Sequence, residues 1–77
     1  MTDKMADVTI HIDEAVAVED RERLQNRLRS LDGVMAAASQ DATPHLMVVE
    51  YDPDVIDSRQ ILDTVTDSGL HAELIGM

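Results

Sequence analysis

The sequence contains no cysteine, and this absence excludes several kinds of chemistry at once. Disulfide bonds, thiolate zinc sites, iron–sulfur clusters and cysteine nucleophiles all require a thiol. The absence also fits a reducing compartment, so we expect the protein to be cytoplasmic. A chain of 77 residues is long enough for one domain. Without disulfides, that domain depends on its core, on well-formed helices and strands, or on a partner.

Aromatic residues and long apolar runs are also scarce. Tyr51 is the only aromatic residue, so the core must be built from aliphatic side chains and methionine. No run approaches the ~20 apolar residues that a membrane span requires. The opening residues, "MTDKMAD", lack the apolar segment of a signal peptide. We therefore expect no membrane span, a flexible leader over residues 1–6 and a single domain over residues 7–77.

Basic residues are also few. The formal net charge is −10, from 16 acidic and 6 basic residues. A nucleic-acid partner needs a cationic face, so we do not expect one. Four of the five arginines fall within residues 21–29, where neighbouring acids offset a basic patch. The acidic surface favours solubility and would also suit a host with high internal salt.

Alternating apolar and polar residues predict the strands. In "VTIHID" the side chains of Val8, Ile10 and Ile12 fall on one face, which is typical of a half-buried strand. The segment "HLMVVEY" carries the strongest strand pattern in the chain. The predicted strands are residues 8–13, 34–39, 45–51 and 70–75.

Two segments with helical periodicity separate these strands. Leu24, Leu28 and Leu31 lie at positions i, i+4 and i+7 and form one apolar stripe, which predicts a helix over residues 19–31. A similar pattern predicts a second helix over residues 59–68. A glycine follows each helix and is expected to end it, and a serine able to cap precedes the second. These residues are Gly33, Gly69 and Ser58.

The predicted order is therefore β-α-β-β-α-β. This order predicts an α+β, ferredoxin-like βαββαβ fold, in which a four-stranded antiparallel sheet carries both helices on one face. The first and third strands are then central, and the other face of the sheet is open to solvent.

Four phrases in this framework are similar to a known family. They are "LDGV" after the first helix, "VEYDP" at the end of the third strand, a helix that begins at a serine, and "SGLHAELI" at the close. In this order and spacing the chain resembles the heavy-metal-associated (HMA) domain, the module of copper chaperones and metal-pumping ATPases. The resemblance covers the chain from about residue 7 and implies the ferredoxin-like fold.

The HMA family binds soft metals through a Met-x-Cys-x-x-Cys loop between the first strand and the first helix. The resemblance aligns the two cysteine positions with Ala17 and Asp20, and the methionine with Ala15. Soft ions favour sulfur ligands, and the loop "AVAVED" contains none. The resemblance therefore implies the fold without the family's metal site.

The same loop, "DEAVAVED", has four acids that raise the alternative of a hard-cation site. Calcium and magnesium prefer oxygen ligands, but such a loop needs closely alternating donors and a glycine. Four apolar residues separate the two acid pairs here. We interpret the acids as solvating the loop, with Glu19 or Asp20 capping the helix. Val16 and Val18 are expected to fill the space beneath it.

Histidines offer a different metal site. His11 is expected on the open face of the sheet, where the last strand pairs with the first. His71 or Glu73 would then approach His11, and His, His and Glu together are suitable ligands for zinc, nickel or copper. The strand register, which decides this, is not fixed by the sequence. His45, beside a turn, is expected to be solvated.

The strongest strand also predicts a surface. If Met47, Val49 and Tyr51 face the helices, Leu46 and Val48 face outward, beside Thr9 and His11. Exposed aliphatic residues on a sheet face are typical of a surface that binds a partner or a second copy of the chain. Met35 and Met47 are expected to fill the core.

Three hypotheses for function follow. The first is a non-catalytic interaction module that docks a protein partner or forms a homodimer through the open sheet face. The second is a metal-binding or metal-transfer protein that uses histidine and carboxylate ligands. The third is a small regulatory domain that binds a metabolite at a dimer interface, by analogy of fold alone. No nucleophile elbow or catalytic triad spacing is present, so we do not expect an enzyme.

Overall fold

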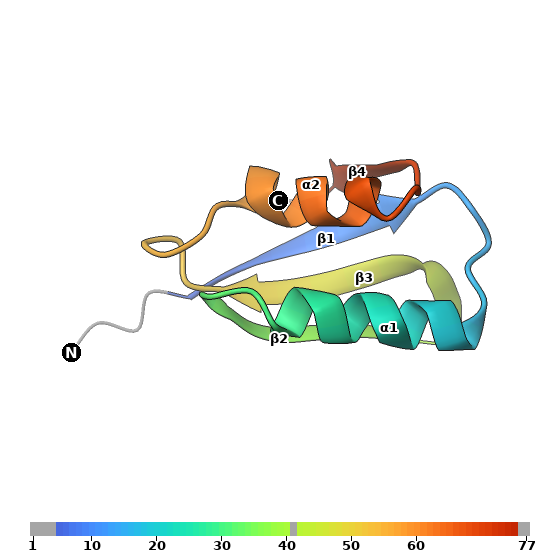
Figure 1. Cartoon of the computed structure of the whole chain (residues 1–77), viewed down its shortest axis with the longest axis horizontal. Helices are drawn as coiled ribbons and strands as arrows, with labels where there is room; N and C mark the ends of the chain where they lie inside the picture. Colours follow the sequence, from blue (N-terminus) through green and yellow to red (C-terminus); the bar gives the residue numbers. More distant parts are fainter. Residues whose placement is uncertain (1–4, 41, 76–77) are drawn as a thin grey trace.

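The computed structural model describes residues 5–40 and 42–75, and it has the predicted element order (Figure 1). Its elements are β1 (Ala6–Ile12), α1 (Val18–Arg29), β2 (Val34–Gln40), β3 (Thr43–Tyr51), α2 (Ser58–Asp67) and β4 (Ala72–Ile75). β1 begins inside the predicted leader, whose residues 1–4 lie outside the described part of the chain. Within the described residues, neither helix is long and apolar enough to cross a membrane.

The four strands form one antiparallel sheet in the order β2-β3-β1-β4, with β3 and β1 in the centre. Both helices cover the same face of this sheet (Figure 1). The ferredoxin-like prediction is therefore confirmed. The second and third strands extend beyond their predicted bounds of 34–39 and 45–51, because Gln40 already pairs with Thr43.

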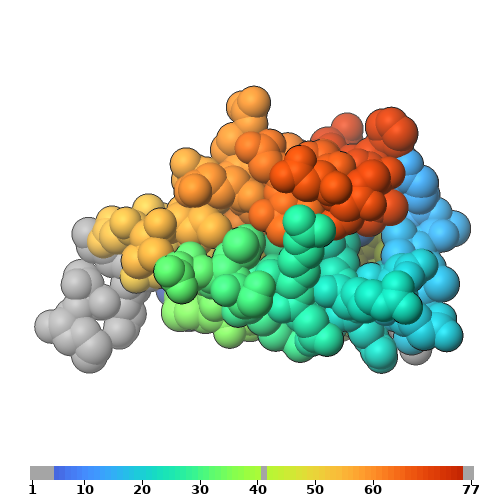
Figure 2. Space-filling model, viewed as in Figure 1, coloured from blue at the N-terminus to red at the C-terminus, as the bar shows by residue number. Residues whose placement is uncertain are grey.

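The core lies between the sheet and the helices, and its composition follows from the alternation in the strands. Two inward-facing residues of each central strand are almost completely buried, together with two residues from each helix. Figure 2 shows the side of the molecule that α1 and α2 cover. The buried core residues of these elements are Ile10, Ile12, Met47, Val49, Leu24, Leu28, Ile61 and Val65.

Two details of the helix ends differ from the prediction. The N-cap of α2 is Asp57, whose side chain accepts a hydrogen bond from the Gln60 amide at 2.8 Å. The Gln60 side chain accepts in return from the Asp57 amide at 3.1 Å, which completes a capping box, so Ser58 is the first helical residue and not the cap. α1 ends at Arg29, and Leu31 packs against the core from the following turn.

The two predicted stop glycines have different roles. Gly69 follows the C-cap of α2 with φ of 90°, as a helix-ending glycine should. Gly33 lies four residues beyond the end of α1, also with positive φ. A Cβ atom at Gly33 would lie 2.8 Å from Ile56 Cγ2 and 2.9 Å from Val55, so this glycine permits a close approach of two loops.

Met35 is not a core residue, contrary to the prediction. Its exposed fraction is 51%, whereas Met47 is buried as expected. The register of β2 against β3 shifts between Val34 and Ala36, which makes Met35 the extra residue of a β-bulge. A single inserted residue of this kind leaves no signal in the local sequence pattern.

Arginines of α1 cover the edge of the sheet formed by β2. Arg29 donates to the Ala37 carbonyl at 3.0 Å, and Arg21 donates to the Gln40 carbonyl at 3.3 Å. Gln25 adds a hydrogen bond to the Ser39 hydroxyl. Unpaired edge groups are the usual template for strand addition, so these contacts make β2 a poor site for a further strand.

Candidate functional site

Two surfaces carry the predicted site residues: the β1–α1 loop and the open face of the sheet. In the loop, Ala17 is the N-cap of α1 and makes no side-chain capping hydrogen bond, so the prediction that Glu19 or Asp20 caps the helix is wrong. Both acids lie in the first turn, where their charge suits the helix dipole. Asp20 also accepts a hydrogen bond from Arg23 at 3.0 Å.

The valines of the loop divide between core and solvent. Val16 packs against the core, as predicted for the space beneath the loop. Val18 begins the helix with 50% of its surface exposed and does not fill that space. The loop therefore has one apolar anchor, and it presents only carboxylates and small apolar groups near positions 17 and 20.

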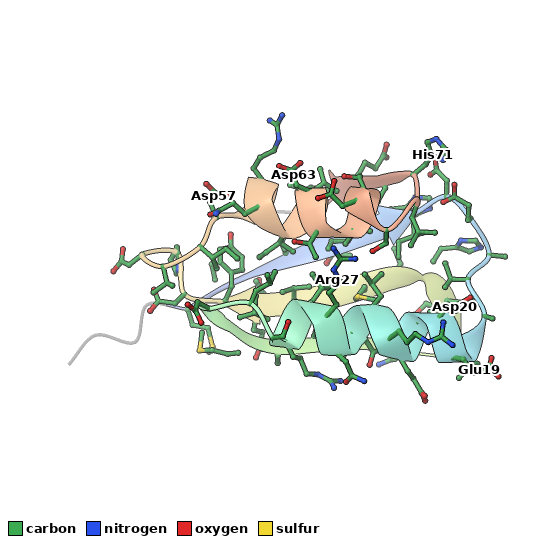
Figure 3. The ribbon with its side chains drawn as sticks, viewed as in Figure 1. Glu19, Asp20, Arg27, Asp57, Asp63 and His71 are labelled. Carbon is green, nitrogen blue, oxygen red and sulfur yellow. The ribbon has the colours of Figure 1, made fainter. Side chains whose placement is uncertain are left out.

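A hydrogen-bonded clamp closes the loop against the turn before β4. Glu14 accepts from the backbone amide of His71 at 2.9 Å and from the His71 Nδ1–H at 2.5 Å. The Asp13 amide donates to the His71 carbonyl at 2.8 Å. Figure 3 shows His71 at the same end of the molecule as Asp20. We call these three contacts the Glu14–His71 clamp.

The clamp shifts both ionisable groups. The hydrogen bond to the His71 side chain lowers the pKa of Glu14 from its ordinary value of 4.5. The same hydrogen bond raises the pKa of His71 from 6.5, and the charge of Glu14 adds to this effect. Each ionised form therefore stabilises the other across the two loops.

The clamp predicts a pH dependence of stability. The contribution of His71 is complete below pH 6.5 and is lost as the pH rises through its raised folded-state pKa. The contribution of Glu14 is complete above pH 4.5 and is lost as the pH falls through its lowered pKa. The difference in melting temperature between the natural chain and Glu14→Gln should therefore peak between these two pH values. A difference that stays constant from acid to alkaline pH would show that the ion pair contributes nothing.

A shallow cleft of about 680 Å³ lies beside the clamp, between the loop, α1 and the end of α2. Its apolar lining includes Val16, Leu24 and Leu70, and its rim carries acids and arginines. Arg27 reaches from α1 across this rim and donates to the Ser68 hydroxyl at 3.2 Å (Figure 3). Arg27 thus contacts a neutral side chain across the rim, and Asp20 and Arg23 form the charged pair within it.

The predicted histidine site is only partly assembled. His11 lies directly opposite Glu73 in the β1–β4 pairing, as expected. His71 is held by Glu14 instead. Within residues 5–40 and 42–75, no three His, Asp or Glu side chains are grouped so as to hold a metal ion. The site at His11, His71 and Glu73 remains a prediction, with two of its three members as neighbours.

The prediction that His45 is solvated beside a turn is wrong. It lies within β3, half-buried, and its Nδ1–H donates to the Ile12 carbonyl at 2.8 Å. Its ring stacks against that of His11, with 6.0 Å between centroids. His11 Nδ1 lies 3.3 Å from the Asp13 carboxylate. The two histidines therefore have structural contacts at the end of the central strands.

The open face of the sheet carries a row of three aliphatic residues and one threonine that crosses all four strands. Val48 pairs with Ala38 on one side and with Thr9 on the other, and Thr9 pairs in turn with Ile75. We call these four residues the cross-strand row. Val48 is 44% exposed and Ile75 is 36% exposed. Leu46 lies beside the row, opposite His11, half-buried but outside the residues packed against the core.

Comparison with known proteins identifies the fold. No protein-family model matches the sequence. No curated protein matches it either. Among solved structures, a copper-binding domain from HMA7, a P-type ATPase, superposes with a TM-score of 0.81 at 17% identity, over 91% of this chain and 93% of that one. The chain has the fold of a heavy-metal-associated domain.

Two further structures agree with this result. The putative copper-ion-binding protein from Bacillus anthracis str. Ames gives a TM-score of 0.82 at 18% identity, over 94% of this chain and all of that one, 100%. The yeast copper transporter domain CCC2A gives 0.80 at 20% identity, over 91% and 94% of the two chains. At such identities the likeness establishes the fold and leaves the activity to be argued from the residues of this chain.

Sequence reasoning missed the Glu14–His71 clamp because its members are 57 positions apart. The predicted topology places their two loops at the same end of the sheet. An acid in one loop and a histidine in the other could therefore have indicated an ion pair. Arg21 and Arg29 were visible only as part of an arginine-rich helix. Their contacts with β2 depend on the rotation of α1, which the apolar stripe fixes only approximately.

Proposed function

We propose that this protein is a non-catalytic interaction module with a heavy-metal-associated fold, which docks its partner through the open face of the sheet. The observation that carries the proposal is the cross-strand row. It places exposed aliphatic side chains in the centre of a face that no helix covers. A small domain with such a face gains stability by covering it.

The β1–α1 loop supports the same proposal because it has no sulfur ligands for a soft metal. The similar structures include copper-binding and copper-transporter domains. A soft metal of that kind needs sulfur or imidazole ligands. The resemblance to the family aligns Ala17 and Asp20 with its two cysteine positions, the sequence has no cysteine, and His71 is engaged by Glu14. Because the loop lacks ligands for a soft metal, we favour a function that does not depend on metal, and binding to another protein is such a function.

Capture of a partner from the source cells tests the proposal. We expect the natural chain to retain a specific protein, or a second copy of itself, and the variant Val48→Asp to lose it. Val18→Asp is the matched control, because Val18 is 50% exposed and lies beside the loop. An aspartate there also suits the start of α1.

The outcome separates the two surfaces. Binding retained by Val18→Asp and lost by Val48→Asp supports docking through the open face. Binding lost by Val18→Asp and retained by Val48→Asp places the contact at the loop and refutes the proposal. A strictly monomeric chain that retains no partner also counts against it. Circular dichroism of both variants confirms that the fold is intact.

A further inference from the structure

Within residues 5–40 and 42–75, the formal charges on the strands around the cross-strand row are all negative. Asp7 and Glu50 lie directly opposite each other in the β1–β3 pairing, on the same face as Val48. On the other side of the row, Glu73 lies opposite His11. Like charges directly opposite across two strands are destabilising, so the Asp7–Glu50 pair is a cost to the isolated fold. We call these three acids the flanking carboxylates.

No cation compensates this cost in the described part of the chain. None of the four strands, as described, contains lysine or arginine. Within residues 5–40 and 42–75, the flanking carboxylates make no ion pair. The arginines interact elsewhere: Arg23 with Asp20, Arg27 with Ser68 and Arg59 with Asp63. The described part of the face therefore combines an apolar centre with uncompensated negative charge.

We propose that the open face binds a protein surface in which an apolar strip is flanked by lysine or arginine. This inference rests on the proposed function and adds the chemistry of the partner. The apolar strip would cover Val48 and Ile75, and its cations would relieve the repulsion between Asp7 and Glu50. Complementary charges of this kind give specificity and fast association.

The same charges argue against a second copy of the chain as the occupant. Two copies placed face to face would bring flanking carboxylates against flanking carboxylates. Juxtaposed like charges across an interface oppose association. The net charge of −10 also opposes self-association at low ionic strength.

The partner is expected to contact side chains of the face rather than to add a strand at β2. That edge is covered by Arg21 and Arg29, which bind its carbonyl groups. Charge complementarity on the face, and not main-chain pairing at β2, would then select the partner.

Two synthetic peptides test the inference on the natural chain. The first, Lys-Lys-Val-Leu-Val-Leu-Lys-Lys, has an apolar centre flanked by cations, and the second replaces its lysines by glutamates. In a ¹⁵N-labelled chain, we expect the lysine peptide to shift the amide signals of Thr9, Val48 and Ile75, and the glutamate peptide to shift none of them. The double variant Asp7→Asn, Glu50→Gln should bind the lysine peptide roughly three- to tenfold more weakly, as loss of two exposed ion pairs implies.

Each other result overturns the inference in an identifiable way. Equal shifts with both peptides would mean that the carboxylates serve hydration and not recognition, while the open face remains a docking surface. Shifts by the lysine peptide that avoid the cross-strand row would reject the face itself. A dimer in light scattering at neutral pH that disappears in Val48→Asp would make a second copy the occupant. Failure of the Val48→Asp capture experiment, in contrast, would refute the proposed function as a whole.

Discussion

Cysteines introduced at positions 17 and 20 should enable the chain to bind copper(I). Copper(I) should then raise the melting temperature of this variant by roughly 10–20 °C, and should not change that of the natural chain. Ala17 is the N-cap of α1 and Asp20 lies in its first turn. The side chains of an N-cap residue and of the third helical residue approach each other, as in a capping box, and a helix N-terminus lowers the pKa of a thiol. Two thiolates there would form the soft site that copper(I) prefers.

The size of this effect follows from ligand linkage. A metal present at 100 times its dissociation constant stabilises the folded state by about 2.7 kcal/mol. In a domain of this length, 1 kcal/mol corresponds to roughly 4–8 °C in melting temperature. The measurement is a thermal melt of Ala17→Cys, Asp20→Cys with copper(I) under anaerobic, reducing conditions.

Two controls make the result specific. The pair Val18→Cys, Asp20→Cys places thiols two positions apart, on diverging faces of the helix, and should give a much smaller shift. The natural chain should show no shift with copper, zinc or nickel at tenfold excess. A shift in the natural chain that disappears in His11→Ala would instead support the histidine site at His11 and Glu73.

Replacement of Gly33 by alanine should destabilise the fold by about 2–5 kcal/mol. The backbone at Gly33 has φ of 94°, a left-handed conformation that costs other residues about 1–2 kcal/mol. The added Cβ would also lie 2.8 Å from Ile56 Cγ2, and forced overpacking costs about 1–3 kcal/mol. Chemical denaturation at 25 °C measures the sum.

Gly69→Ala is the matched control for the backbone term. Gly69 has φ of 90°, but nothing lies within 4 Å of a Cβ placed there. It should therefore cost only the conformational term, about 1–2 kcal/mol. Equal losses in the two variants would mean that the loop after α1 moves away from Ile56 without cost, and would contradict the packing described for Gly33.

The sequence predicted the fold because its local signals agree with one another. Ile10 and Ile12 alternate with polar residues and are buried, while Leu24 and Leu28 form the inner stripe of α1. The cap of the second helix and Gly69 mark where that helix begins and ends, and so separate it from the strands on either side. With a known element order, few topologies remain, and the observed one is the ferredoxin-like arrangement of a split pair of β-α-β units.

The site was harder to predict because it depends on register and on long-range contacts. The pairing of Val48 with Thr9, and of Thr9 with Ile75, needs the register of three strands. A shift of one residue would have turned Val48 toward the core. The bulge at Met35 and the contact between Glu14 and His71 also depend on tertiary packing. Short-range sequence patterns therefore do not predict them.

The open face and the β1–α1 loop are the two candidate binding surfaces, and one measurement compares them directly. A photo-cross-linking residue replaces Val48, Ala17 or Val18 in turn, and the protein is irradiated in its source cells. We expect a covalent adduct with a specific partner from position 48 and none from positions 17 and 18. An adduct from position 17 or 18, with none from position 48, would show that the loop is the binding surface and would contradict this account.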